Sequence, residues 1–242
     1  MRCYIFSGHM RTFKEIKSTF DFTDSHIYIH TYDILGYWDP KTSVKEDNNK
    51  ITKEYILNCF DIQDRNKVKD IVIESVSSKL DIINTYAQQM NPRKIWYGRP
   101  YNFASMHMKR LSALERFFDI KDTVYDYVLL FRPDFLFRQY ELIDVNKIKE
   151  GSIIIQGTDH YSGNKDWLNC VFVIGSELNM YILKTSYKES FERYIKEYTG
   201  DYDPHSYFCF LIKTYFTKYY FIQCGDNHSL INTPGGYCQE VK

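Results

Sequence analysis

The chain has 242 residues, enough for one well-buried domain or for one domain with a small subdomain. Its formal net charge is zero, because 31 Lys and Arg balance 31 Asp and Glu, and this removes the electrostatic case for binding nucleic acid or membrane non-specifically. A hydrophobic fraction of 44% excludes an intrinsically disordered chain.

The apolar pattern predicts short strands that alternate with helices. Strands are expected at 3–6, 25–33, 71–74, 128–131, 151–157, 170–176 and 219–224. Helices are expected from about 12, at 52–60, after 74, and at 102–118, 176–198 and 205–216. This alternation predicts a single domain over 1–242, with an α/β fold and a largely parallel sheet.

Three of these strands end in polar clusters. The clusters are Ser7 to Arg11, His30 to Asp33 and Arg132 to Asp134. Because ligands bind outside the carboxyl ends of parallel strands, we expect the three clusters to line one ligand-binding edge. Pro133 is expected just beyond the strand end, since proline cannot donate to a central ladder.

The first cluster contains the parts needed to hold a phosphate. Ser7 offers a hydroxyl, Gly8 lets a ligand approach the backbone, and Arg11 offers a cation at the expected start of a helix. The spacing matches neither a P-loop nor a dinucleotide fingerprint. An ordinary turn between strand and helix with a surface arginine is the alternative interpretation.

Asp134 is open to three interpretations. It could ligate a metal, accept a hydrogen bond from a sugar, or pair with Arg132 for structural reasons. Its place at a strand end, between apolar flanks, favours a functional role.

Six segments together resemble a known group of proteins. In chain order they are IFSGHMRTF, IYIHTYD, NFASMHMKRLSALERFF, YDYVLLFRPDFLF, GNKDWLNCVFVIGSELNM and DPHSYFCFLI. They resemble small glycosyltransferase-like proteins of bacteria and large DNA viruses, which are similar to the GT-A class of nucleotide-sugar-dependent enzymes. The resemblance implies a GT-A-like (Rossmann-like) α/β/α sandwich, with nucleotide binding in about 1–137 and acceptor binding in about 138–242.

The resemblance also implies roles for individual residues on the donor side. The first strand and loop would hold the nucleotide or diphosphate, the second strand end would line the base and ribose, and one helix would approach the donor. Asp134 would be the second acid of a D-x-D motif. The residues concerned are Ser7, Gly8, Arg11, His30, Tyr32, Asp33, Met106, Arg110, Arg132 and Asp134.

The chain departs from the D-x-D pattern in one place. Arg132 stands where the first aspartate would be, and an arginine cannot ligate a metal, although it can neutralise a diphosphate directly. A divalent metal, Mn or Mg, would then need further ligands beside Asp134, and His228 is the candidate. A surface histidine in a turn is the alternative reading of His228.

On the acceptor side, an inverting transfer needs a carboxylate to deprotonate the attacking hydroxyl. Asp166 fits best, because Trp167 beside it could stack on a sugar and the following strand would fix its position. Asp159 is expected in the acceptor site, with His160 ranked lower as a base. A turn aspartate that caps the loop is the alternative.

We therefore expect a transferase that uses a nucleotide diphospho-sugar donor and a glycan or glycoconjugate acceptor. The competing hypotheses are a non-catalytic nucleotide- or sugar-binding module and a sulfotransferase-like enzyme. The amino-terminal residues do not read as a signal peptide, no run is long enough to cross a membrane, and the six cysteines form no C-x-x-C pair. A cytoplasmic protein with reduced, buried thiols is expected.

Overall fold

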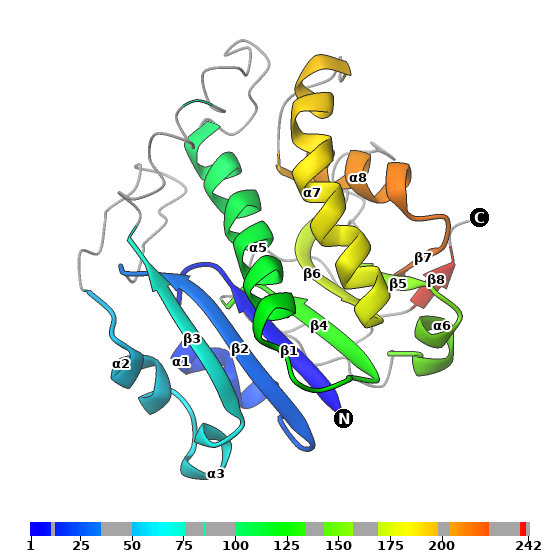
Figure 1. Ribbon diagram of the computed structural model, residues 1–242. Coiled ribbons are helices and arrows are strands. Elements are labelled where there is room, and N and C mark those ends of the chain that lie inside the picture. The colour runs from blue at the N-terminus through cyan, green and yellow to red at the C-terminus, as the bar shows by residue number, and fades with distance from the viewer. Residues whose placement is uncertain are drawn as a thin grey trace.

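The computed structural model describes residues 1–10, 13–34, 50–75, 85, 100–133, 143–156, 169–197, 204–222 and 238–240. Within them, eight strands form one sheet in the order β3-β2-β1-β4-β6-β5-β7-β8 (Figure 1). The strands are β1 (Arg2–Ser7), β2 (Ser25–Tyr32), β3 (Val68–Glu74), β4 (Tyr127–Phe131), β5 (Ile153–Gln156), β6 (Asn169–Gly175), β7 (Tyr219–Ile222) and β8 (Cys238–Glu240). The helices are α1 (Phe13–Ile16), the 3-10 helix η1 (Lys17–Thr19), α2 (Lys53–Asn58), α3 (Ile62–Arg65), α5 (Pro100–Ile120), α6 (Val145–Lys149), α7 (Glu177–Glu197) and α8 (Pro204–Tyr215).

The sheet is mostly parallel, as the sequence predicts. Strands β3, β2, β1 and β4 all run the same way, and β5 runs parallel to β7. Strand β6 is antiparallel to both of its neighbours, and β8 is antiparallel to β7. The carboxyl ends of β1 to β5 and of β7 therefore share one edge of the sheet.

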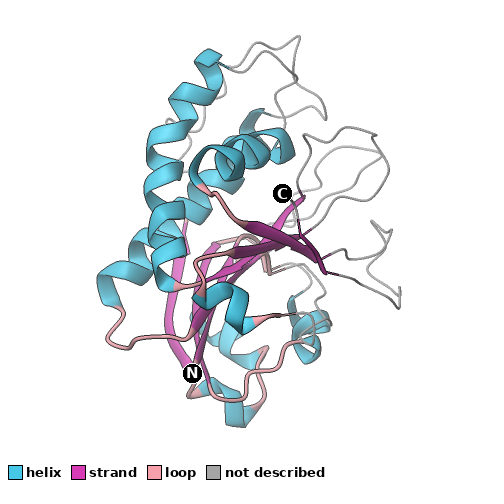
Figure 2. Cartoon of the chain, turned by 90° about the vertical axis from the view of Figure 1, so that its right-hand side faces the viewer, coloured by secondary structure: helices cyan, strands magenta, loops and turns pink. Residues whose placement is uncertain are grey.

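Two apolar cores lie on opposite faces of this sheet. Alternation along β1 sends Cys3 and Ile5 into the core under α5, α7 and α8, and sends Tyr4 and Phe6 into the core over α1, α2 and α6. Figure 2 shows helices on both sides of the strands. The predicted α/β/α sandwich is confirmed for the described residues.

Helix α5 covers the centre of the sheet, running opposite to the strands. Its stripe of Ala113, Leu114 and Phe117 is buried, as expected for an amphipathic helix packed on a sheet. Near its carboxyl end the ring of Phe117 lies 5.2 Å from that of Tyr28, and further up Lys109 donates to the carbonyl of Thr31. The earlier residues of α5 therefore lie over the carboxyl edge of β2.

Most of the expected elements are present within a few residues of their predicted bounds. Strand β4 ends at Phe131, and Pro133 lies in the turn beyond it, as predicted. Helices α3 and α6 and strand β8 were not predicted, and the helix expected after residue 74 lies outside the described residues. Cys3, Cys59 and Cys209 are buried free thiols, and no helix in the described part of the chain is long and apolar enough to span a membrane.

Candidate functional site

The strand order reverses between β1 and β4. From β1 the chain proceeds through β2 to β3 at one side of the sheet, and α5 then carries it back to β4 on the other side of β1. The connection through α1 packs on one face and α5 packs on the other. Ligands of open α/β sheets bind in the crevice outside such a point, so the ends of β1 and β4 are the candidate site.

His30, Ser7 and Arg132 form a row across this edge. Ser7 pairs in register with His30 of β2, and Arg132 follows Phe131, which pairs with Phe6 of β1. Neighbouring strands lie about 4.8 Å apart, so the three residues are adjacent in space. Ile5, Tyr28 and Leu130 are buried under α5, each two residues before a member of the row. The alternation of side chains along a strand therefore assigns Ser7, His30 and Arg132 to the same face.

Two members of this row are buried and have unused hydrogen-bonding capacity. Among the described residues, neither the hydroxyl of Ser7 nor either ring nitrogen of His30 makes a hydrogen bond, although Nε2 of His30 lies 3.3 Å from Oε1 of Glu74. Buried polar atoms are normally paired, so unpaired ones at a ligand-binding edge point to a ligand. Arg132 is half-buried at the end of the row.

A buried ion pair supports the row from the side of β3. Nζ of Lys109 lies 2.5 Å from Oε2 of Glu74, 3.3 Å from the carbonyl of Thr31 and 3.8 Å from the ring centre of Tyr32. Burial alone would raise the pKa of Glu74, but the contact with His30 and the hydrogen bond from Lys109 outweigh it and hold that pKa well below its usual range. Sequence reasoning missed both Lys109 and Glu74.

Tyr32 and Asp33 occupy the end of β2, as predicted. Tyr32 is buried, and its ring contacts that of His9 at 4.9 Å. The backbone of Asp33 donates to the carbonyl of Glu74 and accepts from the amide of Ile51. The structure thus brings both residues to the carboxyl edge, while their contact with a nucleotide stays a prediction.

Gly8 brings the loops after β1 and β4 together. Its φ of +136° is a conformation that side chains disfavour, and a Cβ at this position would lie 3.2 Å from Cδ of Pro133. Its amide also donates to the carbonyl of His30, at 3.2 Å. Gly8 therefore closes the gap between β1 and the turn that carries Arg132.

Substituting Gly8 with alanine is expected to cost about 2 kcal/mol of unfolding free energy, because the new Cβ meets both backbone strain and Pro133. Chemical denaturation measures this loss. Gly151→Ala is the matched control: Gly151 has a φ of +87° but no heavy atom within 4 Å of the added Cβ, so its cost should be about half as large. Equal losses in the two variants would show that the contact with Pro133 contributes nothing.

Arg110 covers the same face of the sheet from α5. It is 1% exposed, its Nη1 donates to the hydroxyl of Tyr187 at 3.3 Å, and its Cζ lies 5.6 Å from the ring centre of Phe208. Within the part of the chain that the structure describes, its Nε and Nη2 have no hydrogen-bond partner. Met106, one turn earlier, is partly buried against the core formed by α5, α7 and α8.

The remaining predicted site residues lie outside the described part of the chain. They are Arg11, Asp134, Asp159, His160, Asp166, Trp167 and His228. Their assignments to donor, acceptor, base and metal remain predictions.

The described side chains at the edge do not by themselves fit a divalent cation. No group of three His, Cys, Asp or Glu that could hold a metal ion occurs among the described residues, and the carboxylate of Glu74 is in contact with His30 and Lys109. The row offers a hydroxyl, an imidazole and the guanidinium of Arg132, which are groups that suit an oxyanion. Asp33 adds a carboxylate beside the row.

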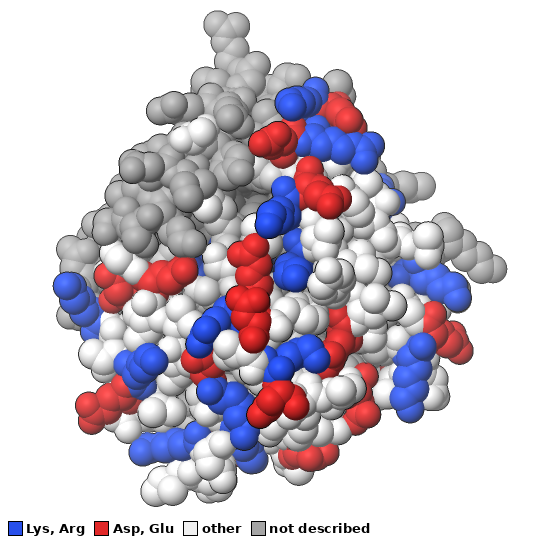
Figure 3. Space-filling model, viewed as in Figure 1, with Lys and Arg blue, Asp and Glu red and all other residues white. Residues whose placement is uncertain are grey.

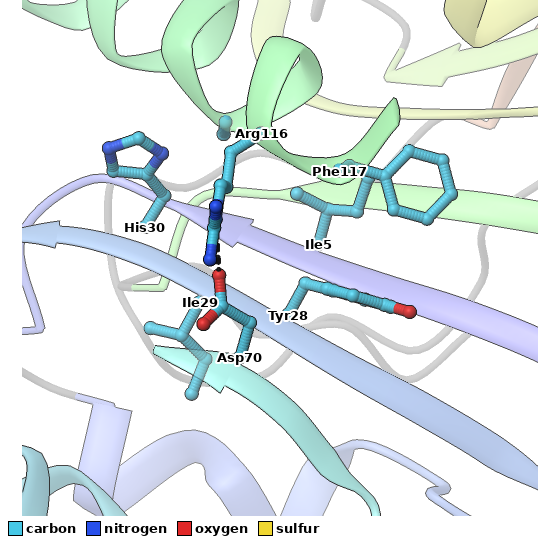
Figure 4. Close-up of a pocket in the computed structure, with 8 residues that line it drawn as sticks. Ile5, Tyr28, Ile29, His30, Asp70, Arg116 and Phe117 are labelled. Atoms are coloured by element: carbon cyan, nitrogen blue, oxygen red, sulfur yellow. Dashed lines mark hydrogen bonds and ion pairs between the residues drawn. The ribbon is translucent and has the colours of Figure 1, made fainter. Parts of the chain in front are cut away.

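A small cavity lies under α5, further from the carboxyl edge. Figure 4 shows the ion pair of Arg116 and Asp70 between the helix and the strands, with His30 on one side and Tyr28 and Phe117 on the other. Nε of Arg116 donates to Oδ2 of Asp70 at 2.9 Å. The cavity has room for roughly one water molecule, which excludes it as a nucleotide site.

The described residues on the face seen in Figure 3 form no large patch of one charge. Acidic and basic side chains are interspersed over the face seen in Figure 3, in line with the zero net charge. The view gives no support to a nucleic-acid surface on that face.

Comparisons with known proteins add little. No protein-family model matches the chain, and no curated protein matches it. Among solved structures, mouse xyloside xylosyltransferase 1 in its apo form is similar over 88% of this chain and 81% of its own, with 9% identity and a TM-score of 0.45. A TM-score below 0.5 does not establish a common fold.

Proposed function

We propose that this protein is a glycosyltransferase that moves a sugar from a nucleotide diphospho-sugar to a hydroxyl of a glycan or glycoconjugate. The observation that supports this most is the row of His30, Ser7 and Arg132 at the point where the strand order reverses. That is the place where α/β sheets bind nucleotides, and the row presents groups that hold phosphate oxygens.

In the proposed reaction, the acceptor oxygen attacks the anomeric carbon as the bond from that carbon to the diphosphate oxygen breaks. Negative charge grows on the departing nucleoside diphosphate, and Arg132 beside Ser7 would stabilise it. Asp166, or Asp159, would accept the proton of the acceptor hydroxyl. Asp134 and His228 are the residues that would hold a divalent metal, which would share the neutralisation of the diphosphate.

Thermal-shift screening tests the donor site. We expect UDP or GDP to raise the melting temperature, with no comparable shift for CMP or adenosine 3′-phosphate 5′-phosphosulfate. Ser7→Ala should weaken nucleotide binding by about tenfold, the usual cost of removing a hydrogen bond to a charged group. Ser25→Ala is the matched control, since Ser25 is buried at the opposite end of β2 and its hydroxyl already donates to the carbonyl of Phe22.

The same screen separates the competing functions. A shift with the phosphosulfate alone would favour a sulfotransferase. Binding of a nucleotide sugar with neither hydrolysis nor transfer, with or without manganese, would favour a binding module. If no nucleoside diphosphate shifts the melting temperature and Asp134→Ala binds as the parent does, the proposal is wrong.

A further inference from the structure

Helix α5 buries two adjacent cations in opposite ways. Lys109 is enclosed by acceptors, with the carboxylate of Glu74 and the carbonyl of Thr31 within reach of its Nζ. Arg110 is equally buried, yet its one hydrogen bond to a described residue goes to the neutral hydroxyl of Tyr187. Burying a charge without a counter-charge costs several kcal/mol, so the position of Arg110 is not explained by stability.

The unused atoms of Arg110 are the two that matter for recognition. Nε and Nη2 lie on the same edge of the guanidinium plane, and neither has a hydrogen-bond partner among the described residues. The N–H groups of this edge point in parallel, with a spacing that matches two oxygens of a carboxylate or phosphate. Nη1 is occupied by Tyr187, which fixes the plane of the group.

The surroundings of Arg110 make such a bond strong. Tyr187 of α7 is 3% exposed and Phe208 of α8 is fully buried, and the ring of Tyr207 lies 6.1 Å from that of Tyr187. Aromatic walls exclude water and lower the local dielectric, so an oxyanion placed here interacts with Arg110 more strongly than it would in solvent.

The location ties Arg110 to the edge of the sheet. Its neighbour Lys109 binds the carbonyl of Thr31, next to His30, so Arg110 lies at the height of the row on the face to which alternation assigns Ser7 and His30. Both of those side chains also have unpaired buried polar atoms.

We propose that Arg110 is a bidentate receptor for an oxyanion of the substrate. The inference deepens the proposed transferase function, on which it rests for the identity of the ligand. Two sources offer the required chemistry: the diphosphate of the donor, and the carboxylate of an acidic sugar. No bond is made or broken at Arg110; its charge and its two donors hold and orient the group.

Replacement by a residue of similar size without charge tests this. Arg110→Met should melt at a temperature equal to or above that of the parent, because it removes an uncompensated buried charge. It should also bind the anion at least about tenfold more weakly. The probes are pyrophosphate and glucuronate, each titrated against parent and variant in a thermal-shift assay. A shift with pyrophosphate identifies the diphosphate as the occupant, and a shift with glucuronate identifies an acidic sugar.

Three further variants sharpen the test. Arg110→Lys keeps the charge and loses the parallel donors, so its affinity should fall between those of the parent and Arg110→Met. Lys109→Met should melt below the parent, since it leaves Glu74 without its closest partner. Arg116→Met should leave anion binding unchanged, because Arg116 pairs with Asp70 outside the row.

The proposal is overturned if neither probe shifts the parent, or if Arg110→Met binds the probe as tightly as the parent does. It is also overturned if Arg110→Met melts well below the parent, which a structural role predicts. Failure of this proposal is distinguishable from failure of the transferase function. If pyrophosphate binding depends on Arg110 but no nucleotide sugar is turned over, the receptor role of Arg110 holds and the transferase function is wrong. If the parent and Arg110→Met turn over the nucleotide sugar equally, the transferase function holds and the receptor role of Arg110 is wrong.

Discussion

Lys109→Met is expected to lower the free energy of unfolding by about 3 kcal/mol, the low end of the range for breaking a buried ion pair. The side chain of Lys109 is 1% exposed, and its Nζ lies 2.5 Å from the carboxylate of Glu74, whose side chain is 21% exposed. The carboxylate keeps its contact with His30 and is partly solvated in the variant, which keeps the loss from being larger. Urea denaturation of parent and variant measures it.

The control for this prediction is a double-mutant cycle. Glu74→Gln alone leaves Lys109 buried without its counter-charge, and the combination with Lys109→Met removes both charges. We expect the double variant to be more stable than the sum of the single losses predicts. Strict additivity would show that the two side chains do not interact.

The pH dependence of stability gives an independent check of the same pair. The contact with His30 and the hydrogen bond from Lys109 depress the pKa of Glu74 in the folded state despite its burial. A glutamate in the unfolded state takes up its proton at about pH 4.3. Below that pH the folded state therefore binds fewer protons than the unfolded state. The parent should therefore lose stability as the pH falls below about 4.3, and Lys109→Met should lose less over the same range. Parallel curves would contradict the assigned pairing.

Local pattern was sufficient to predict which residues end the strands at the carboxyl edge of the sheet. Polar clusters after apolar runs marked the ends of β1, β2 and β4, and Pro133 marked the end of β4 correctly. These signals are local, since alternation and strand breaking depend on neighbouring residues. The edge that carries Ser7, His30 and Arg132 was thus predictable.

The order of the strands was not predictable in the same way. Ser7 meets His30 and adjoins Arg132 because β4 pairs with β1, and this pairing joins segments far apart in the chain. The antiparallel direction of β6 was also missed, since an apolar run reads the same in either direction. Helix α6 did leave a signal: Asp144 caps it by accepting from the amides of Asn146 and Lys147, but five residues are too few to show a helical period.

The role of Lys109 was hidden by helix geometry. No pattern in the sequence singles out Lys109, which stands next to Arg110 beside the apolar stripe of the helix. Helix α5 is enclosed by the sheet, α7 and α8, so its buried width includes both Lys109 and Arg110. Lys109 has a carboxylate partner because Glu74 lies on the neighbouring strand β3, and this position does not follow from the local sequence of α5.

The last prediction concerns Arg132, the residue that replaces the first acid of the D-x-D pattern. If the guanidinium of Arg132 neutralises the departing diphosphate, a role that a metal has in a full D-x-D site, Arg132→Asp should lower kcat in the absence of metal. The expected loss is roughly a hundredfold to a thousandfold, the usual effect of removing a group that stabilises the transition state.

The same substitution brings a second carboxylate close to Asp134, and carboxylates are the ligands that Mn and Mg prefer. Manganese should therefore restore a larger part of the activity of Arg132→Asp than of Arg132→Ala, which gains no ligand. Turnover of the nucleotide sugar across a manganese titration is the measurement. Equal manganese responses in the two variants would show that residue 132 lies outside the reach of a metal on the diphosphate. An unchanged kcat in both variants would show that Arg132 does not contact the leaving group.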